Sequence, residues 1–262
     1  MNEWKAFRGR ITLFPTMPPS SSPPSVLELY RQIWGGEPDA FQQQQANVLA
    51  PAVATGKRDG MIVNCVVQPA RIDFDLAAAP SQETQMTVAL IDHPIGFLDE
   101  LKRIIDIFDK GFLSNGVSRV ALNLQFLKLN PSHAEANKAV TEIIPDRYAV
   151  TVTNEEDFIF QINQPETSRE INDIRMNFIT KWSVERFQIL TISIPTGGVA
   201  MGAGMTSPSP QTETFIAASV LFDNNNIPGR ALTGKEQSAL LHEALDAAVG
   251  MQREIGLNIE GF

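Results

Sequence analysis

The stretch that decides the fold is VSRVALNLQFLKL, at residues 117–129. Apolar side chains occupy every second position through most of it, at Val120, Leu122, Leu124 and Phe126. Successive side chains of a β-strand point to opposite faces of its sheet, so this alternation predicts a long strand with one buried face.

Strands are predicted on both sides of this stretch. They fall at residues 10–14, 61–77, 86–91, 158–162, 170–184, 186–194 and 214–222, and the 61–77 segment is either one long strand or a strand broken in two. Two long amphipathic helices are predicted at 97–112 and 234–255, where apolar residues recur at i+3 and i+4. Thr233 and Glu236 have the spacing of a capping box at the start of the second helix.

The order of these elements predicts an α+β fold with mostly antiparallel sheet, because the strands come in runs instead of alternating strictly with helices. Gln68 with Pro69, and Gln164 with Pro165, each lie between strand segments. This recurrence indicates either an internal repeat or the coincidence of a common dipeptide. We expect two related β-rich halves, 1–145 and 146–262, each carrying one long amphipathic helix and sharing one core.

Composition excludes several classes of protein. The formal net charge of −9 disfavours non-specific nucleic-acid binding, which depends on neutralising phosphates. Cys65 is the single cysteine, so an internal disulfide and a multi-cysteine zinc site are excluded, and Cys65 is expected to be a small buried residue. The first residues lack the apolar core of a signal peptide, and no apolar run approaches the ~18–20 residues that span a bilayer. We expect a cytoplasmic protein that binds neither nucleic acid nor membranes.

The order of elements is similar to that of a sporadically distributed family of bacterial proteins of about this length. The resemblance lies in the strand FIFQI at 158–162, the strand end LFDNN at 221–225 and the closing helix at 240–256. That family has no established activity, so the resemblance implies no functional residue and no cofactor.

The glycine-rich stretch PTGGVAMGAGMTSPSPQ, at 195–211, has no charged residue and lies between two predicted strands. Loops longer than about 12–15 residues are uncommon in compact domains, and are usually functional or disordered. The stretch lacks the Gly-x-Gly-x-x-Gly spacing, the lysine and the following helix of phosphate-binding loops. It is therefore predicted either to be a disordered hairpin tip or to bind a protein partner, with contacts from Gly197, Gly198, Val199, Met201, Gly202, Gly204 and Met205.

No catalytic set is apparent in the sequence. His93, His133 and His242 are scattered and have no second metal ligand at a familiar spacing. Asp73 and Asp75 are two residues apart on a predicted strand, so both side chains point to the same face. Such a pair either holds Mg²⁺ or shares a proton, or it is the solvated face of a half-buried strand.

These observations favour a non-enzymatic interaction or assembly subunit. We expect it to contact itself, as a homo-oligomer, or a protein partner, through the stretch at 195–211 or through a sheet edge. The alternative is a small-molecule or metal-dependent enzyme with a carboxylate site at strand ends, such as Asp73 and Asp75. Nucleic-acid binding by a composite basic face is the third possibility, and the acidic net charge makes it the least favoured of the three.

Overall fold

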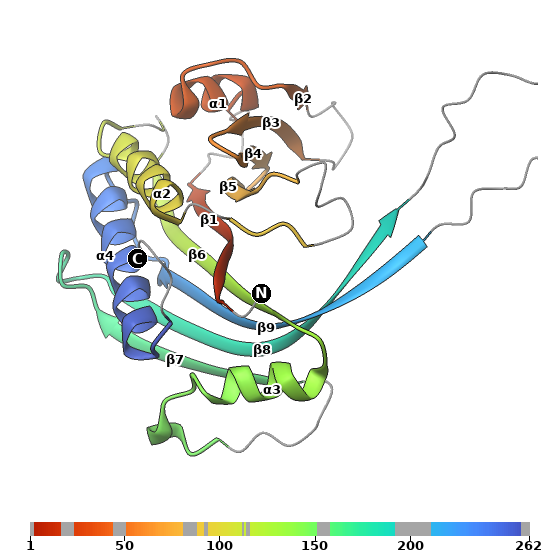
Figure 1. Ribbon diagram of the computed structural model, residues 1–262. Coiled ribbons are helices and arrows are strands. Elements are labelled where there is room, and N and C mark those ends of the chain that lie inside the picture. Colours follow the sequence, from red (N-terminus) through yellow and green to blue (C-terminus); the bar gives the residue numbers. More distant parts are fainter. Residues whose placement is uncertain are drawn as a thin grey trace, which may run out of the picture.

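The strand predicted at 117–129 is β6 (Val117–Asn130), which lies near the middle of a nine-stranded antiparallel sheet in the computed structural model (Figure 1). The structure describes residues 3–16, 24–43, 51–80, 88–91, 94–111, 113, 116–150, 158–191 and 211–257. Within them the other strands are β1 (Lys5–Pro15), β2 (Ala40–Gln42), β3 (Ala52–Arg58), β4 (Met61–Gln68), β5 (Arg71–Ala78), β7 (Ile159–Thr167), β8 (Arg175–Thr191) and β9 (Gln211–Asn226). The helices are α1 (Val26–Trp34), α2 (Pro94–Phe108), α3 (His133–Thr141) and α4 (Gly234–Glu254), with a 3-10 turn at Asp146–Tyr148.

The strand order β2-β3-β4-β5-β1-β6-β9-β8-β7 makes the sheet continuous from one end to the other. The N-terminal strand β1 lies between β5 and β6, so that Arg10 is opposite Asp75 on one side and Asn123 on the other. β6 pairs in turn with β9 from the C-terminal part of the chain. The sheet therefore runs through the predicted division between residues 145 and 146.

The prediction of two β-rich halves, each with its own long helix, is wrong. The two Gln-Pro dipeptides occupy different structural positions, because Gln68 ends β4 at the turn to β5 whereas Gln164 and Pro165 lie inside the edge strand β7. The long helices α2 and α4 pack against each other instead of covering separate sheets (Figure 1). The strands form one sheet because β1 lies between β5 and β6 and so joins β2–β5 to β6–β9.

All of the described helices contact the same face of this sheet. The alternating residues of β6 that point to this face are the apolar set of the 117–129 stretch, and they are at most 1% exposed. Each helix has a residue in contact with this face. Tyr30 of α1 lies near Gly56, and Phe97 of α2 lies near Gly9. His133 of α3 contacts Arg186, and the Ala244 carbonyl of α4 accepts a hydrogen bond from Asn224. The opposite face carries Arg10, Asp75 and Asn123, and no described helix contacts it; we call it the open face.

The ends of the helices follow the predicted capping. At the start of α4 the Thr233 hydroxyl accepts a hydrogen bond from the Glu236 N–H, and the Glu236 carboxylate accepts one from the Thr233 N–H at 2.7 Å. Arg230 and this backbone bond hold the pKa of Glu236 down at about 2. The capping box is therefore confirmed. None of the helices in the described part of the chain is long and apolar enough to cross a membrane.

The close approach of α2 to β1 depends on Gly9. A Cβ atom at this position would lie 2.6 Å from the Cζ atom of Phe97, which is fully buried. We expect Gly9→Ala to lower the free energy of unfolding by about 1–3 kcal/mol, because the buried ring has to shift. Urea denaturation measures this change. The matched control is Gly96→Ala in α2, where the added Cβ meets nothing within 4 Å and helix propensity raises stability by up to about 1 kcal/mol.

Candidate functional site

The predicted partner-binding residues Gly197, Gly198, Val199, Met201, Gly202, Gly204 and Met205 lie outside the described residues. The structure does describe where their segment joins the fold. Thr191 ends β8, Gln211 begins β9, and these two residues are paired in the sheet. The glycine-rich stretch therefore connects β8 and β9, the two longest of the described strands.

The ends of β8 and β9 extend beyond their other neighbours as a two-stranded ribbon (Figure 1). In the described residues, the pairing of β7 with β8 stops at Ser183, and the pairing of β6 with β9 stops at Ile216. From the Phe187–Phe215 pair onward β8 and β9 pair with each other alone, as far as Thr191 and Gln211. We define the ribbon as residues 187–191 and 211–215.

The ribbon has an apolar side, and that side lies on the open face. Phe187 is paired with Phe215 across the two strands, and the next residue of β8 on this side is Ile189. All three are half-buried and pack against a second apolar cluster, which is separate from the main core and whose buried residues are Val88, Leu127 and Ala217. On the opposite side of the ribbon, exposed Gln188 is paired with exposed Thr214.

An irregularity in β1 adds a further aromatic ring to this cluster. The register between β1 and β6 shifts between Ala6 and Arg8, so Phe7 is an extra residue of the kind found in a β-bulge. The ring of Phe7 lies edge-on against that of Phe187, with 5.6 Å between the centroids. The apolar side of the ribbon thus continues onto the body of the sheet.

Asp73 and Asp75 lie on the same face, as their spacing predicts, but the expectation of a solvated face is wrong. Their exposed fractions are 3% and 5%. Asp75 Oδ1 accepts hydrogen bonds from Arg8 Nη2 at 2.8 Å and from Arg10 Nε at 2.6 Å. The Asp75 side chain is buried because long arginine side chains from the adjacent strand β1 bond to it.

Asp73 is neutralised in the same way. It accepts hydrogen bonds from Arg71 Nε at 2.8 Å and from the Thr12 hydroxyl at 2.6 Å. The two carboxylates are therefore already occupied by guanidinium and hydroxyl donors, which disfavours the use of their oxygens as Mg²⁺ ligands. No group of three or more His, Cys, Asp or Glu residues within the described ranges is arranged to hold a metal ion.

Charged and amide side chains continue across the open face from these aspartates. Arg119 donates to Asn225 at 2.9 Å, and Gln125 donates to Glu185 at 3.1 Å. Burial raises the pKa of Asp223, and the nearby Arg119 opposes this shift. The open face therefore changes from polar at its centre to apolar along the ribbon.

The remaining candidates for catalysis are not brought together. His133 lies 3.0 Å from Arg186, and His242 pairs with Asp106 at 2.8 Å on a different helix. His93 lies outside the described residues. Cys65 is fully buried, and burial raises the pKa of its thiol far above the ordinary range, which confirms the expectation of a small buried residue.

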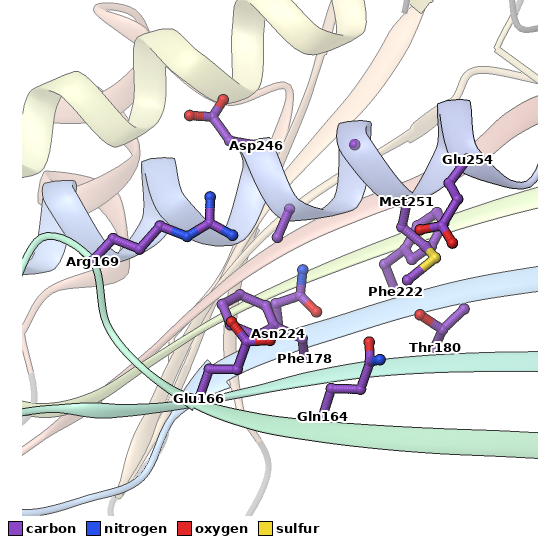
Figure 2. Close-up of a pocket in the computed structure, with 12 residues that line it drawn as sticks. Gln164, Glu166, Arg169, Phe178, Thr180, Phe222, Asn224, Asp246, Met251 and Glu254 are labelled. Carbon is purple, nitrogen blue, oxygen red and sulfur yellow. The ribbon is translucent and has the colours of Figure 1, made fainter.

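Sequence reasoning missed a pocket of about 270 Å³ between α4 and strands β7, β8 and β9 (Figure 2). It also did not single out the aromatic residues of the ribbon. The sequence did contain a pattern that indicates the ribbon, since Phe187 and Ile189 alternate with polar residues and Phe215 lies in a predicted strand. No sequence pattern indicates the pocket, because its lining residues come from segments that are distant in sequence.

No protein-family model, curated protein or solved structure matches the chain. The resemblance to a bacterial family stays a prediction, and function is inferred from the geometry of the described residues.

Proposed function

We propose that the protein is a cytoplasmic, non-enzymatic assembly subunit that binds a second copy of itself through the apolar side of the ribbon. The observation that carries this proposal is the half-buried set Phe187, Ile189 and Phe215 on strands that extend past their neighbours. A two-stranded hairpin is marginally stable by itself in water, and stacking an apolar sheet face on another sheet stabilises both.

A second copy is the favoured partner because of the distribution of apolar residues on the ribbon. The aromatic residues Phe187 and Phe215 lie on the same side, so two ribbons related by a two-fold axis present the same aromatic surface to each other. In this proposal the glycine-rich stretch at 195–211, which connects the two strands of the ribbon, adds contacts to the same neighbour. A different protein partner is the alternative outcome.

Cysteine cross-linking tests the side of the ribbon that forms the contact. The native thiol of Cys65 is fully buried, so the unmodified chain supplies an unreactive background. We expect Ile189→Cys to give covalent dimers with a short bismaleimide reagent, because the apolar sides of two ribbons meet. The matched control is Gln188→Cys, which places the thiol on the opposite, polar side of the same strand and is expected to stay monomeric on a denaturing gel.

Two cross-linking results contradict the proposal. Equal cross-linking of the two variants indicates random collision, and no cross-linking of either indicates that the apolar side does not face a second copy. Adding a large excess of unmodified protein to Ile189→Cys is expected to lower the yield of dimer, because unmodified chains compete for the same contact.

A further inference from the structure

The pocket between α4 and the sheet has a chemical character that the proposed assembly does not use. Figure 2 shows Arg169 entering from one end, Glu254 and Met251 at the other, and Asn224 and Thr180 along the sheet side. Its volume of about 270 Å³ is just below the usual range for ligand sites. A ligand that fits it is therefore a small molecule.

Arg169 is held in place by a buried carboxylate. Glu243 of α4 is 8% exposed and accepts hydrogen bonds from the Ser168 hydroxyl at 2.5 Å and from the Arg169 backbone N–H at 2.9 Å. The Ser168 hydroxyl in turn accepts from the backbone N–H groups of Glu170 and Ile171. These bonds tie the turn after β7 to α4 and fix the starting point of the Arg169 side chain.

The guanidinium group of Arg169 is directed into the pocket (Figure 2), and in the described part of the chain it forms no ion pair. An arginine in this position presents a planar set of donors that matches a carboxylate in a bidentate fashion. One end of the pocket is therefore suited to an anionic group of carboxylate geometry.

Asn224 supplies a fixed acceptor inside the pocket. Its side chain is 3% exposed, and its Nδ2 atom donates to the Ala244 carbonyl of α4 at 2.8 Å. This bond fixes the orientation of the amide, and the Oδ1 atom accepts no hydrogen bond from the described residues. Since the amide lines the pocket, Oδ1 is available to a donor on a ligand (Figure 2).

One carboxylate lies near this acceptor. Glu166 is on the sheet side of the pocket and forms no ion pair among the described residues, whereas Glu254 is paired with Arg147 and the Asp246 carboxylate points away from the sheet (Figure 2). The rest of the lining includes the apolar side chains of Phe178, Phe222 and Met251. The lining thus combines one cation, one unpaired anion, a fixed acceptor and an apolar floor.

We infer that this pocket binds a free α-amino acid with an apolar side chain. The ligand's carboxylate pairs with Arg169, and its ammonium group donates to Asn224 Oδ1 and to the Glu166 carboxylate. Its side chain lies on Phe222 and Met251. Arg169 and Glu166 are exposed, so a molecule with only one of the two charges leaves the other side chain in water and lowers affinity by the loss of one charge-assisted contact.

Isothermal titration calorimetry of the full chain with L-methionine, L-leucine and L-phenylalanine tests this inference. We expect saturable binding of at least one of them, weakened about 10-fold or more in N-acetyl-L-methionine and in L-methioninamide, because each derivative loses one charge-assisted contact. Arg169→Gln is expected to weaken binding of the free amino acid by a similar factor. Arg175→Gln, at an exposed position of β8 outside the pocket lining, is the matched control and is expected to bind as the unmodified chain does.

Three results overturn the inference. They are no binding of any of the three amino acids, binding of the blocked derivatives equal to that of the free ones, and equal loss of binding in Arg169→Gln and Arg175→Gln. Circular dichroism shows whether each variant folds, so a loss of binding in a folded variant reports on the pocket alone.

Discussion

Replacing Phe187 and Phe215 together by serine is expected to convert the assembled protein into single chains of 28.8 kDa. The two rings are paired across β8 and β9 on the apolar side of the ribbon, and Phe187 also contacts Phe7. Aromatic residues at the centre of an interface often contribute about 2 kcal/mol or more each. The double variant removes these rings from both copies, so it weakens association by at least about 1,000-fold, which sedimentation equilibrium measures directly.

The matched control for this variant is the next pair along the ribbon. Gln188→Ser with Thr214→Ser changes two residues that are also paired across β8 and β9 but lie on the opposite, exposed side. We expect its association constant to equal that of the unmodified protein. If association is weakened equally in the two double variants, it depends on the folding of the ribbon and not on contacts made by its apolar side.

The second large effect is expected at Asp75, where we predict a loss of stability in Asp75→Asn of about 1.5–2 kcal/mol. The carboxylate is buried and accepts hydrogen bonds from both Arg8 and Arg10, and hydrogen bonds to charged groups contribute about 1.5–3 kcal/mol. The lower part of this range applies because the arginine side chains are 38% and 27% exposed and remain partly solvated. Urea denaturation measures the change in the free energy of unfolding.

An exposed ion pair provides the comparison. Asp173 pairs with Arg230 at 3.1 Å, but its side chain is 64% exposed, so Asp173→Asn is expected to change stability little. The arginine contacts of Asp75 also predict that Mg²⁺ leaves the melting temperature of the unmodified protein unchanged. A rise in melting temperature with Mg²⁺ that disappears in Asp75→Asn contradicts this account and favours the carboxylate enzyme.

The sequence predicted local elements well because their signals are local. The alternation at 117–129 corresponds to β6, and Thr233 and Glu236 mark the start of α4. The predicted break between strands at 184 and 186 is wrong, because Glu185 lies within the continuous strand β8. Its carboxylate accepts hydrogen bonds from Gln125 and Ser183 on the open face, so a charged residue does not interrupt the strand.

Long-range pairing could not be predicted from these signals. The position of β1 between β5 and β6 depends on contacts such as Arg10 with Asp75, which are 65 residues apart. The pocket depends on Glu243 binding the turn at Ser168, 75 residues earlier. The spacing rule that placed Asp73 and Asp75 on one face did not indicate that Arg8 and Arg10 of another strand would bind Asp75.

The mass of the unmodified protein in solution, measured by light scattering across a range of concentrations, tests the central claim most directly. The proposed contact between ribbons predicts a mass that rises with concentration to at least twice 28.8 kDa, and the Phe187→Ser, Phe215→Ser variant is expected to stay at that single-chain mass. A mass of 28.8 kDa for the unmodified protein at every concentration contradicts self-assembly through the ribbon.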